Sequence, residues 1–307
     1  MYLLLWIFFV YAFLGWCTEV SFAALTSGRF VNRGFLNGPV CPIYGVGVVI
    51  VLFFLDPLRG NTFLLFLGSV LLTSLLEWVT GFVLEKIFHQ RWWDYSNEPF
   101  NLGGYICLRF SIAWGLACLF VVEIIHPSIL WLIHLIPHTL GLVLLALFSA
   151  GMLVDLAATV RTIARMNRQL TQLDELASRI QALSNELGEN LAERVIDAAE
   201  LGSGLREDIQ ENLEDAKDVL AQRREDLQDS LEDMKESLAE RRMQYQMDQA
   251  ERLEQRQRDL AELRTKLEAA MARPIFGQRR LMRAFPKMRS TTHAQALERL
   301  RQWMEKR

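Results

Sequence analysis

Two polar segments carry the residues of this chain whose types and spacing suit chemistry. One runs from Gly28 to Gly45, with the sequence GRFVNRGFLNGPVCPIYG, and the other from Phe88 to Leu108, with the sequence FHQRWWDYSNEPFNLGGYICL. They interrupt an otherwise apolar first half of the chain and contain most of its arginines and amides. We expect any chemical or transport site to lie in these segments.

The first segment offers hydrogen-bond donors on Asn32, Arg33 and Asn37. The planar guanidinium of Arg33 suits a carboxylate or a phosphate, which it can bind through two parallel hydrogen bonds. An arginine at the cytoplasmic edge of a membrane is also common as a simple anchor. Both interpretations of Arg33 stay open.

In the second segment, Trp92 and Trp93 are followed by Asp94 and Asn101. One interpretation is a pocket walled by the two indoles, in which Asp94 pairs with Arg33. The other is an interfacial belt, because tryptophan is enriched at membrane surfaces for purely physical reasons.

Three acids lie within or at the ends of apolar runs, namely Glu19, Glu77 and Glu85. A charge at the centre of a membrane helix costs about 2.5–3.5 kcal/mol on insertion scales, so such groups usually face the interior of a bundle and mark function. Glu77 is the strongest single candidate. Its spacing from Glu85 places both on nearly the same helix face, and Arg109 is a possible partner.

Long apolar runs fill the rest of residues 1–160, and each approaches the roughly 20 residues that a helix needs to cross the hydrocarbon core. They predict an all-α, polytopic bundle of about five transmembrane helices. The predicted spans are Tyr2 to Leu25, Pro39 to Leu55, Thr62 to Leu84, Tyr105 to Ile125 and Ile129 to Leu156.

Basic residues follow the first, third and fifth spans, whereas the alternate connections contain only Arg59. Because basic residues favour the cytoplasmic side, we expect a cell (inner or plasma) membrane protein with its N-terminus outside and its C-terminus in the cytoplasm. Both polar segments then lie on the cytoplasmic side, where they can meet.

Beyond the predicted membrane domain (1–160), residues 161–272 are rich in charged residues and leucine, which predicts long cytoplasmic helices. Heptad spacing predicts a coiled coil or an antiparallel hairpin, and hence a homo-oligomer. Glycines at 188, 202 and 204 mark the expected break. The heptad positions include Leu213, Leu220, Leu227, Met234, Leu253, Leu260 and Leu267.

Residues 273–307 form a basic tail with a short predicted helix, suited either to anionic lipid or to capping the coiled coil. The long helical region mixes both charge signs, so a nucleic-acid partner is not expected. His134 and His138 have a helical spacing that zinc sites use, but no acid on the same turn completes a ligand set. We expect no metal and no cofactor.

Several stretches together resemble the bacterial putative ABC-transporter type IV family. These are the first polar segment, EWVTGFVLEKIFHQRWWDYS, PFNLGGYICLRFSIAWG and the late RRLMRAFPK. The resemblance covers most of residues 1–155 and the tail after Gly277. It implies an integral membrane protein described as a permease, and it carries over no substrate and no catalytic residue.

Three functions are compatible with these observations. The first is a permease subunit of unknown substrate that works with a separate ATPase, because the chain contains no GxxxxGK[ST] phosphate loop. The second is a lipid-modifying enzyme in which Arg33 holds a phosphate headgroup and Glu85 or Asp94 acts as the base. The third is a membrane scaffold that recruits proteins through its coiled coil. Transport is favoured over catalysis, and membrane lipid is an expected partner in each case.

Overall fold

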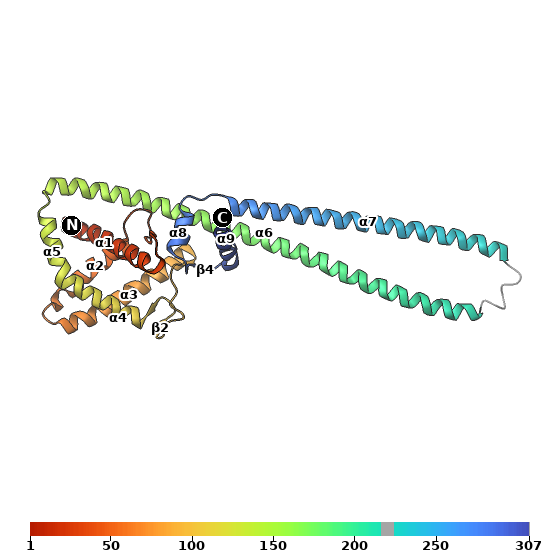
Figure 1. The fold of residues 1–307 in the computed structure, drawn as a ribbon, viewed down its shortest axis with the longest axis horizontal. Coiled ribbons are helices and arrows are strands. Elements are labelled where there is room, and N and C mark those ends of the chain that lie inside the picture. Colours follow the sequence, from red (N-terminus) through yellow and green to blue (C-terminus); the bar gives the residue numbers. More distant parts are fainter. Residues whose placement is uncertain (216–223, 307) are drawn as a thin grey trace. The chain divides into compact units, whose positions relative to one another are not determined.

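The computed structural model describes residues 1–215 and 224–306, and at positions 189–236, 238 and 242 it gives no side-chain detail. The described residues are mostly helical and form two compact units. The bundle unit comprises residues 1–171 and 273–307, and the hairpin unit comprises residues 172–272. The basic tail, which the sequence sets apart as a third segment, therefore packs with the bundle (Figure 1).

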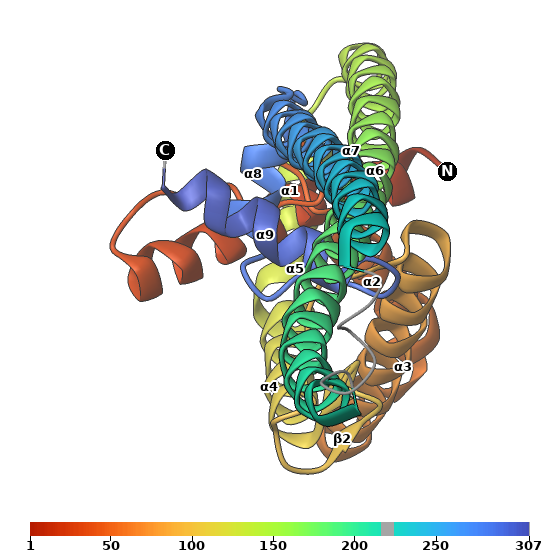
Figure 2. The same ribbon diagram turned by 90° about the vertical axis from the view of Figure 1, so that its right-hand side faces the viewer.

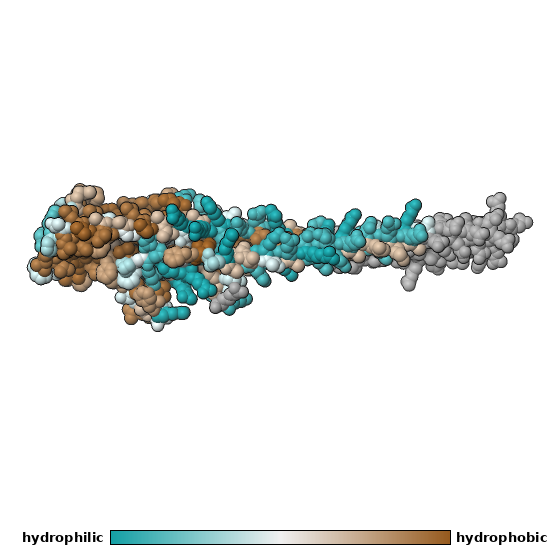
Figure 3. All heavy atoms as spheres, turned by 90° about the horizontal axis from the view of Figure 1, so that it is seen from above, coloured by the Kyte–Doolittle hydropathy of each residue, from teal (hydrophilic) through white to brown (hydrophobic). Residues whose placement is uncertain are grey.

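Among the described residues, four helices are long and apolar enough to cross a membrane, in agreement with the predicted membrane bundle. In Figure 3 the surface of this part of the chain is largely hydrophobic. The helices are α1 (Tyr2–Ser27), α3 (Thr62–Phe88), the continuous run of α4 (Leu108–Phe120), η2 (Val121–Ile125) and α5 (His126–His134), and the first part of α6 (His138–Asp215).

The predicted second span is shorter than expected, so the part of the chain that the structure describes has four helices of this length and one shorter apolar helix. It consists of α2 (Pro42–Leu55), with 14 residues, and the short η1 (Asp56–Leu58). The prediction began this span at Pro39. The backbone of Cys41 is extended, and Pro42 occupies the first turn of α2. Proline suits the first turn of a helix and pushes the preceding residue out of the helical region, so Pro42 sets the start.

The predicted break between the fourth and fifth spans is also wrong. A loop is predicted at residues 126–128, but the helix continues through them to His134. Pro127 lies in the first turn of α5, directly after the π-helical turn η2. The widened turn accommodates the proline without ending the helix. As a result His126 is buried, within 3.4 Å of the Tyr11 hydroxyl.

Glycines allow the helices of the bundle to approach closely. A Cβ added at Gly45 of α2 would collide with the backbone carbonyl oxygen of Phe8 in α1. A Cβ at Gly15 of α1 would likewise collide with the ring of Tyr44. Small residues at such contacts let membrane helices gain van der Waals packing that larger side chains would prevent. These contacts fix α2 against α1 and so place Tyr44, at the end of the first polar segment, beside Glu19 of α1.

The tail returns to the end of the bundle where the two polar segments lie, which we call the polar end, and it contacts both segments. Strand β1 (Gln90–Arg91) pairs antiparallel with β4 (Arg289–Ser290) from the tail, and β2 (Asn101–Leu102) pairs with β3 (Ile106–Cys107). On the helix α8 (Gln278–Ala284), Arg280 donates to the carbonyl oxygens of Gly34 at 2.6 Å and Phe35 at 3.0 Å. The final helix, α9 (Ala294–Glu305), buries Leu297 and Leu300.

The hairpin unit consists of the second part of α6 and the whole of α7 (Arg224–Ala272), which lie side by side in both views (Figure 1 and Figure 2). Arg256 of α7 pairs with Glu186 of α6 at 2.7 Å. The prediction of a break at glycines 188, 202 and 204 is wrong, because α6 runs through all three. A glycine inside a helix costs only about 0.5–1 kcal/mol, which neighbouring turns can offset.

The predicted heptad positions are described only in part. Leu253, Leu260 and Leu267 are partly buried. The side chains at Leu213, Leu220, Leu227 and Met234 lie outside the described residues. The antiparallel arrangement of the two helices agrees with one of the two predicted arrangements, and the coiled coil stays a prediction.

The close contact at Gly45 gives a test with a matched control on the same helix. We expect Gly45→Ala to destabilise the detergent-solubilised protein by about 1–3 kcal/mol, because the added methyl group meets the backbone of α1. Gly47→Ala should have little effect or stabilise slightly, since nothing lies within 4 Å of its added Cβ. Thermal unfolding of the two variants measures the difference, and equal midpoints would contradict this packing.

Candidate functional site

An inner polar cluster lies between the spans near the polar end of the bundle. It comprises Glu19, Arg33, Tyr44, Glu77 and Tyr95. Tyr44 of α2 donates its hydroxyl to Glu19 of α1 at 2.6 Å, and the Nε of Arg33 lies 3.5 Å from the other oxygen of Glu19. Tyr95 donates to Glu77 of α3 at 3.2 Å. Three helices and both polar segments thus contribute to one cluster.

Glu77 differs from Glu19 in the partners of its carboxylate. Its Oε1 accepts from Tyr95, whereas its Oε2 is buried without a hydrogen-bond partner in the described part of the chain. Burial and the adjacent Glu77 hold the pKa of Tyr95 well above its usual range, so this hydroxyl stays protonated and able to donate. Arg109, considered as a partner for Glu77, instead lies over the ring of Phe110 at 5.8 Å.

A chain of alternating charges leads from the end of α3 to the tail. Arg91 donates to Glu85 at 2.9 Å, and the Tyr105 hydroxyl donates to the same carboxylate oxygen at 2.9 Å. Arg91 also lies 3.7 Å from Asp94, and Asp94 pairs with Arg289 of the tail at 3.2 Å. The sequence suggested Arg33 as the partner of Asp94. The structure pairs Arg33 with Glu19 instead, because Arg33 sits on the loop that follows α1.

Asp94 is held ionised by its surroundings. The hydroxyl and backbone amide of Ser96 both donate to its Oδ1. These hydrogen bonds, led by that of the hydroxyl, lower the pKa of Asp94 together with the charges of Arg289 and Arg91. Its side chain is 9% exposed, whereas that of Arg289 is 69% exposed. Asp94 is therefore an ionised carboxylate that lies where the second polar segment meets the tail.

The amides of the first segment shape its backbone. Asn32 accepts from the indole of Trp16 at 2.8 Å and donates to the carbonyl oxygen of Asn37 at 2.8 Å. Asn37 donates in turn to the carboxylate of Asp155 on α6, at 2.8 Å from its side chain and 3.1 Å from its backbone. The direct role of both amides in this structure is to hold the loop.

The two neighbouring tryptophans have different surroundings. Trp92 is buried, and its ring makes edge contacts with Phe35 of the first segment and Phe285 of the tail. Trp93 donates its indole N–H to the carbonyl oxygen of Tyr105 at 2.9 Å. Asn101 donates to the carbonyl oxygens of Ser96 and Glu98 and so closes its own loop. Trp92 therefore joins the two polar segments and the tail.

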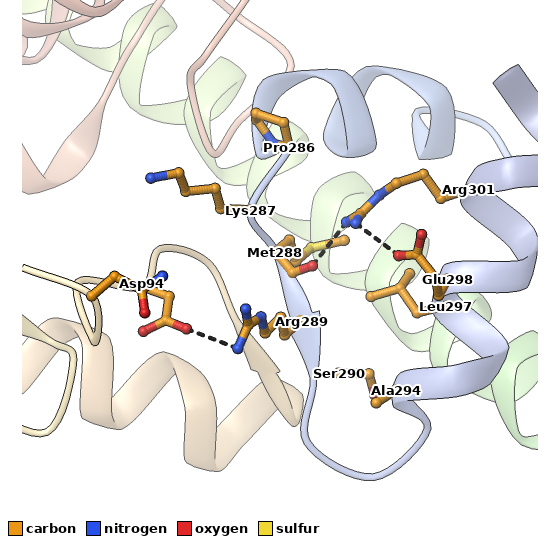
Figure 4. Close-up of a pocket in the computed structure, with 11 residues that line it drawn as sticks. Asp94, Pro286, Lys287, Met288, Arg289, Ser290, Ala294, Leu297, Glu298 and Arg301 are labelled. Carbon is orange, nitrogen blue, oxygen red and sulfur yellow. Dashed lines mark hydrogen bonds and ion pairs between the residues drawn. The ribbon is translucent and has the colours of Figure 1, made fainter.

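A pocket of about 350 Å³ opens between the second polar segment and the tail. Figure 4 shows Asp94 on one side of it and the tail residues on the other. Its charged lining residues are Asp94, Lys287, Arg289, Glu298 and Arg301. No group of three or more potential metal-ligating side chains occurs among the residues that the structure describes.

Sequence reasoning did not select several residues that build these sites. Tyr44, Tyr95 and Arg280 carry no pattern of their own, because their roles depend on which loop or helix they meet. Asp155 did carry a signal, since it is an acid within the last predicted apolar span, the same criterion that selected Glu77. It anchors the first segment.

The lowered pKa of Asp94 predicts a pH dependence of the bundle. Because this pKa is lower in the folded protein than in the unfolded chain, the stabilisation is fully present above the usual carboxyl pKa of about 3.9 and is lost as the pH falls through the lowered value. We expect Asp94→Asn to lower the free energy of unfolding by about 1 kcal/mol at pH 7. On acidification, the stability of this variant should fall less than that of the wild type. Glu98→Gln, which changes a partly buried acid of the same loop, should keep the wild-type pH profile of thermal unfolding.

Comparison with known proteins supports the membrane assignment. No solved structure matches the chain. The family model described as putative ABC-transporter type IV matches residues 6–160, which include the inner polar cluster and Asp155. On the strength of that match, which covers half of its length, the chain belongs to the putative ABC-transporter type IV family of membrane proteins.

Proposed function

We propose that this chain is the membrane-spanning permease subunit of a transporter, and that its solute passes the inner polar cluster. The observation that carries the proposal is the buried Oε2 of Glu77, which has no hydrogen-bond partner among the described residues. A buried acceptor without a donor costs about 1–3 kcal/mol. Ionisable groups within spans usually line substrate or ion pathways.

The chemistry of the cluster bears on the solute. Glu19 and Glu77 bring two carboxylates close enough for their charges to interact, whereas Arg33 is the one cation in the cluster and lies beside Glu19. The open acceptor of Glu77 suits a solute that donates a hydrogen bond or carries positive charge.

The energy source would be a separate ATPase. An ATP-driven transporter needs a nucleotide-binding subunit, and these 307 residues contain no GxxxxGK[ST] phosphate loop. The basic residues after the first and third spans favour a cytoplasmic position for the polar end. That end, with its docked tail, would then offer the surface for the ATPase.

A second copy of the chain would complete the pathway. Four long apolar helices and one shorter one are few to enclose a path through a membrane. The partly buried leucines of the hairpin unit suit association through the long helices. We therefore propose a homo-oligomer with the N-terminus outside and the C-terminus in the cytoplasm.

Gentle extraction of the tagged protein from its native membrane, followed by mass spectrometry of bound proteins and lipids, tests the ATPase. We expect a stoichiometric ATP-binding subunit, and addition of ATP should give hydrolysis in the purified complex. A self-oligomer that retains one phospholipid class and no ATPase would contradict the permease and favour the lipid-modifying enzyme.

The role of Glu77 is tested by an isosteric change. We expect Glu77→Gln to reduce the solute uptake restored in a deletion strain by tenfold or more, a change worth about 1.4 kcal/mol, because the amide cannot provide the same anionic acceptor. Glu123→Gln is the matched control, since Glu123 is an exposed acid within the fourth predicted span. Comparison of metabolite uptake between the strains, at equal membrane levels of protein, gives the result. Full uptake by the Glu77→Gln strain would contradict the proposed pathway.

A further inference from the structure

The pocket between the second polar segment and the tail is a separate feature from the inner polar cluster. Asp94 and Asn97 line it from the segment, and residues from Pro286 to Arg301 line it from the tail. The tail lies outside the part of the chain that matches the family model, which ends at residue 160. Three cations and two acids line this pocket, so its net charge is positive by one.

Both acids already have partners. One oxygen of Asp94 forms an ion pair with Arg289, and the other accepts hydrogen bonds from Ser96. Glu298 accepts from Arg301 at 3.2 Å and from Gln302 at 3.4 Å. Each acid of the pocket is thus paired with an arginine, and the formal charge left over among the lining residues is positive.

The cations, in contrast, retain unused donors. Lys287 forms no hydrogen bond or ion pair with any residue that the structure describes, and Figure 4 shows it extending in the same direction as Arg289, toward the loop that carries Asp94. Arg289 engages Asp94 through Nη1 and is 69% exposed. The buried Nε of Arg301 has no hydrogen-bond partner in the described part of the chain. The free capacity of the pocket is thus cationic.

We propose that this pocket binds a phosphate group, with Lys287 and Arg289 as its principal cationic contacts. A guanidinium and an ammonium are the usual protein groups for phosphate. The volume of about 350 Å³ is at the lower end of the range for small-molecule sites, which suits a headgroup or a small phosphate compound. The site does not depend on the proposed transport, because it shares no residue with the inner polar cluster.

The position of the pocket gives binding a structural consequence. Lys287 and Arg289 flank the start of β4, which pairs with β1 of the second segment. A phosphate held by the tail cations beside Asp94 and Asn97 would add a bridge between the tail and that segment. Ligand binding should therefore stabilise the docked tail.

The test uses the full-length protein in nanodiscs with two probes. One arm adds inorganic phosphate to nanodiscs of phosphatidylcholine, and the other compares phosphatidylglycerol with phosphatidylcholine nanodiscs. In each arm the ligand-induced rise in the thermal unfolding midpoint is measured for the wild type, Lys287→Gln and Lys306→Gln. Lys306 is an exposed lysine of the same tail that does not line the pocket.

We expect Lys287→Gln to lower the apparent affinity for the probe about tenfold, because it removes one charge-assisted hydrogen bond. Lys306→Gln should leave the apparent affinity within twofold of the wild-type value. A response in the first arm identifies a soluble phosphate compound as sufficient, and a response in the second arm alone identifies a lipid headgroup. Either supports the site. No response in both arms, or an equal loss in the two variants, would overturn the proposal.

Discussion

The carboxylate of Asp155 is the constraint on which the polar end of this bundle depends. It accepts hydrogen bonds from the backbone and side chain of Asn37 and from the amide of Gly38 at 2.6 Å. Irregular backbone beside a membrane is tolerated only where its polar groups are satisfied. Arg280 satisfies two carbonyl oxygens of the same loop. Together they fix the loop that brings Arg33 to Glu19, and hence one side of the inner polar cluster.

Charges at the polar end are arranged in two layers. The inner layer pairs acids of the spans with tyrosine hydroxyls and Arg33. The outer layer continues from Glu85 through Arg91 to Asp94 and the tail residue Arg289. Because each acid of the outer layer contacts a cation from another segment, the tail is part of the electrostatic structure of the bundle. This joins the residues that match the family to a segment that lies outside the match.

Hydrophobicity made the fold class predictable, but two span boundaries were not. The apolar runs are long enough that only a membrane bundle can bury them. The break at His126 was misplaced because a proline in a sequence normally signals a helix end. Here η2 widens the turn before Pro127 and the helix continues. The predicted break at the glycines within α6 was wrong for a similar reason. The small helix-destabilising effect of each glycine is outweighed by the rest of the helix, which continues through them.

The sequence by itself determined the membrane bundle, the long charged helices and the two polar segments. These features follow from the composition of each stretch and from the spacing of apolar residues along it. The sequence also selected Glu19, Arg33, Glu77, Glu85 and Asp94 by their types and positions. Only the tertiary structure decided which of them meet. Pairing depends on distances across the fold: Glu77 meets Tyr95, and Asp94 meets the distant Arg289. No local pattern encodes that the tail returns to cover the polar end.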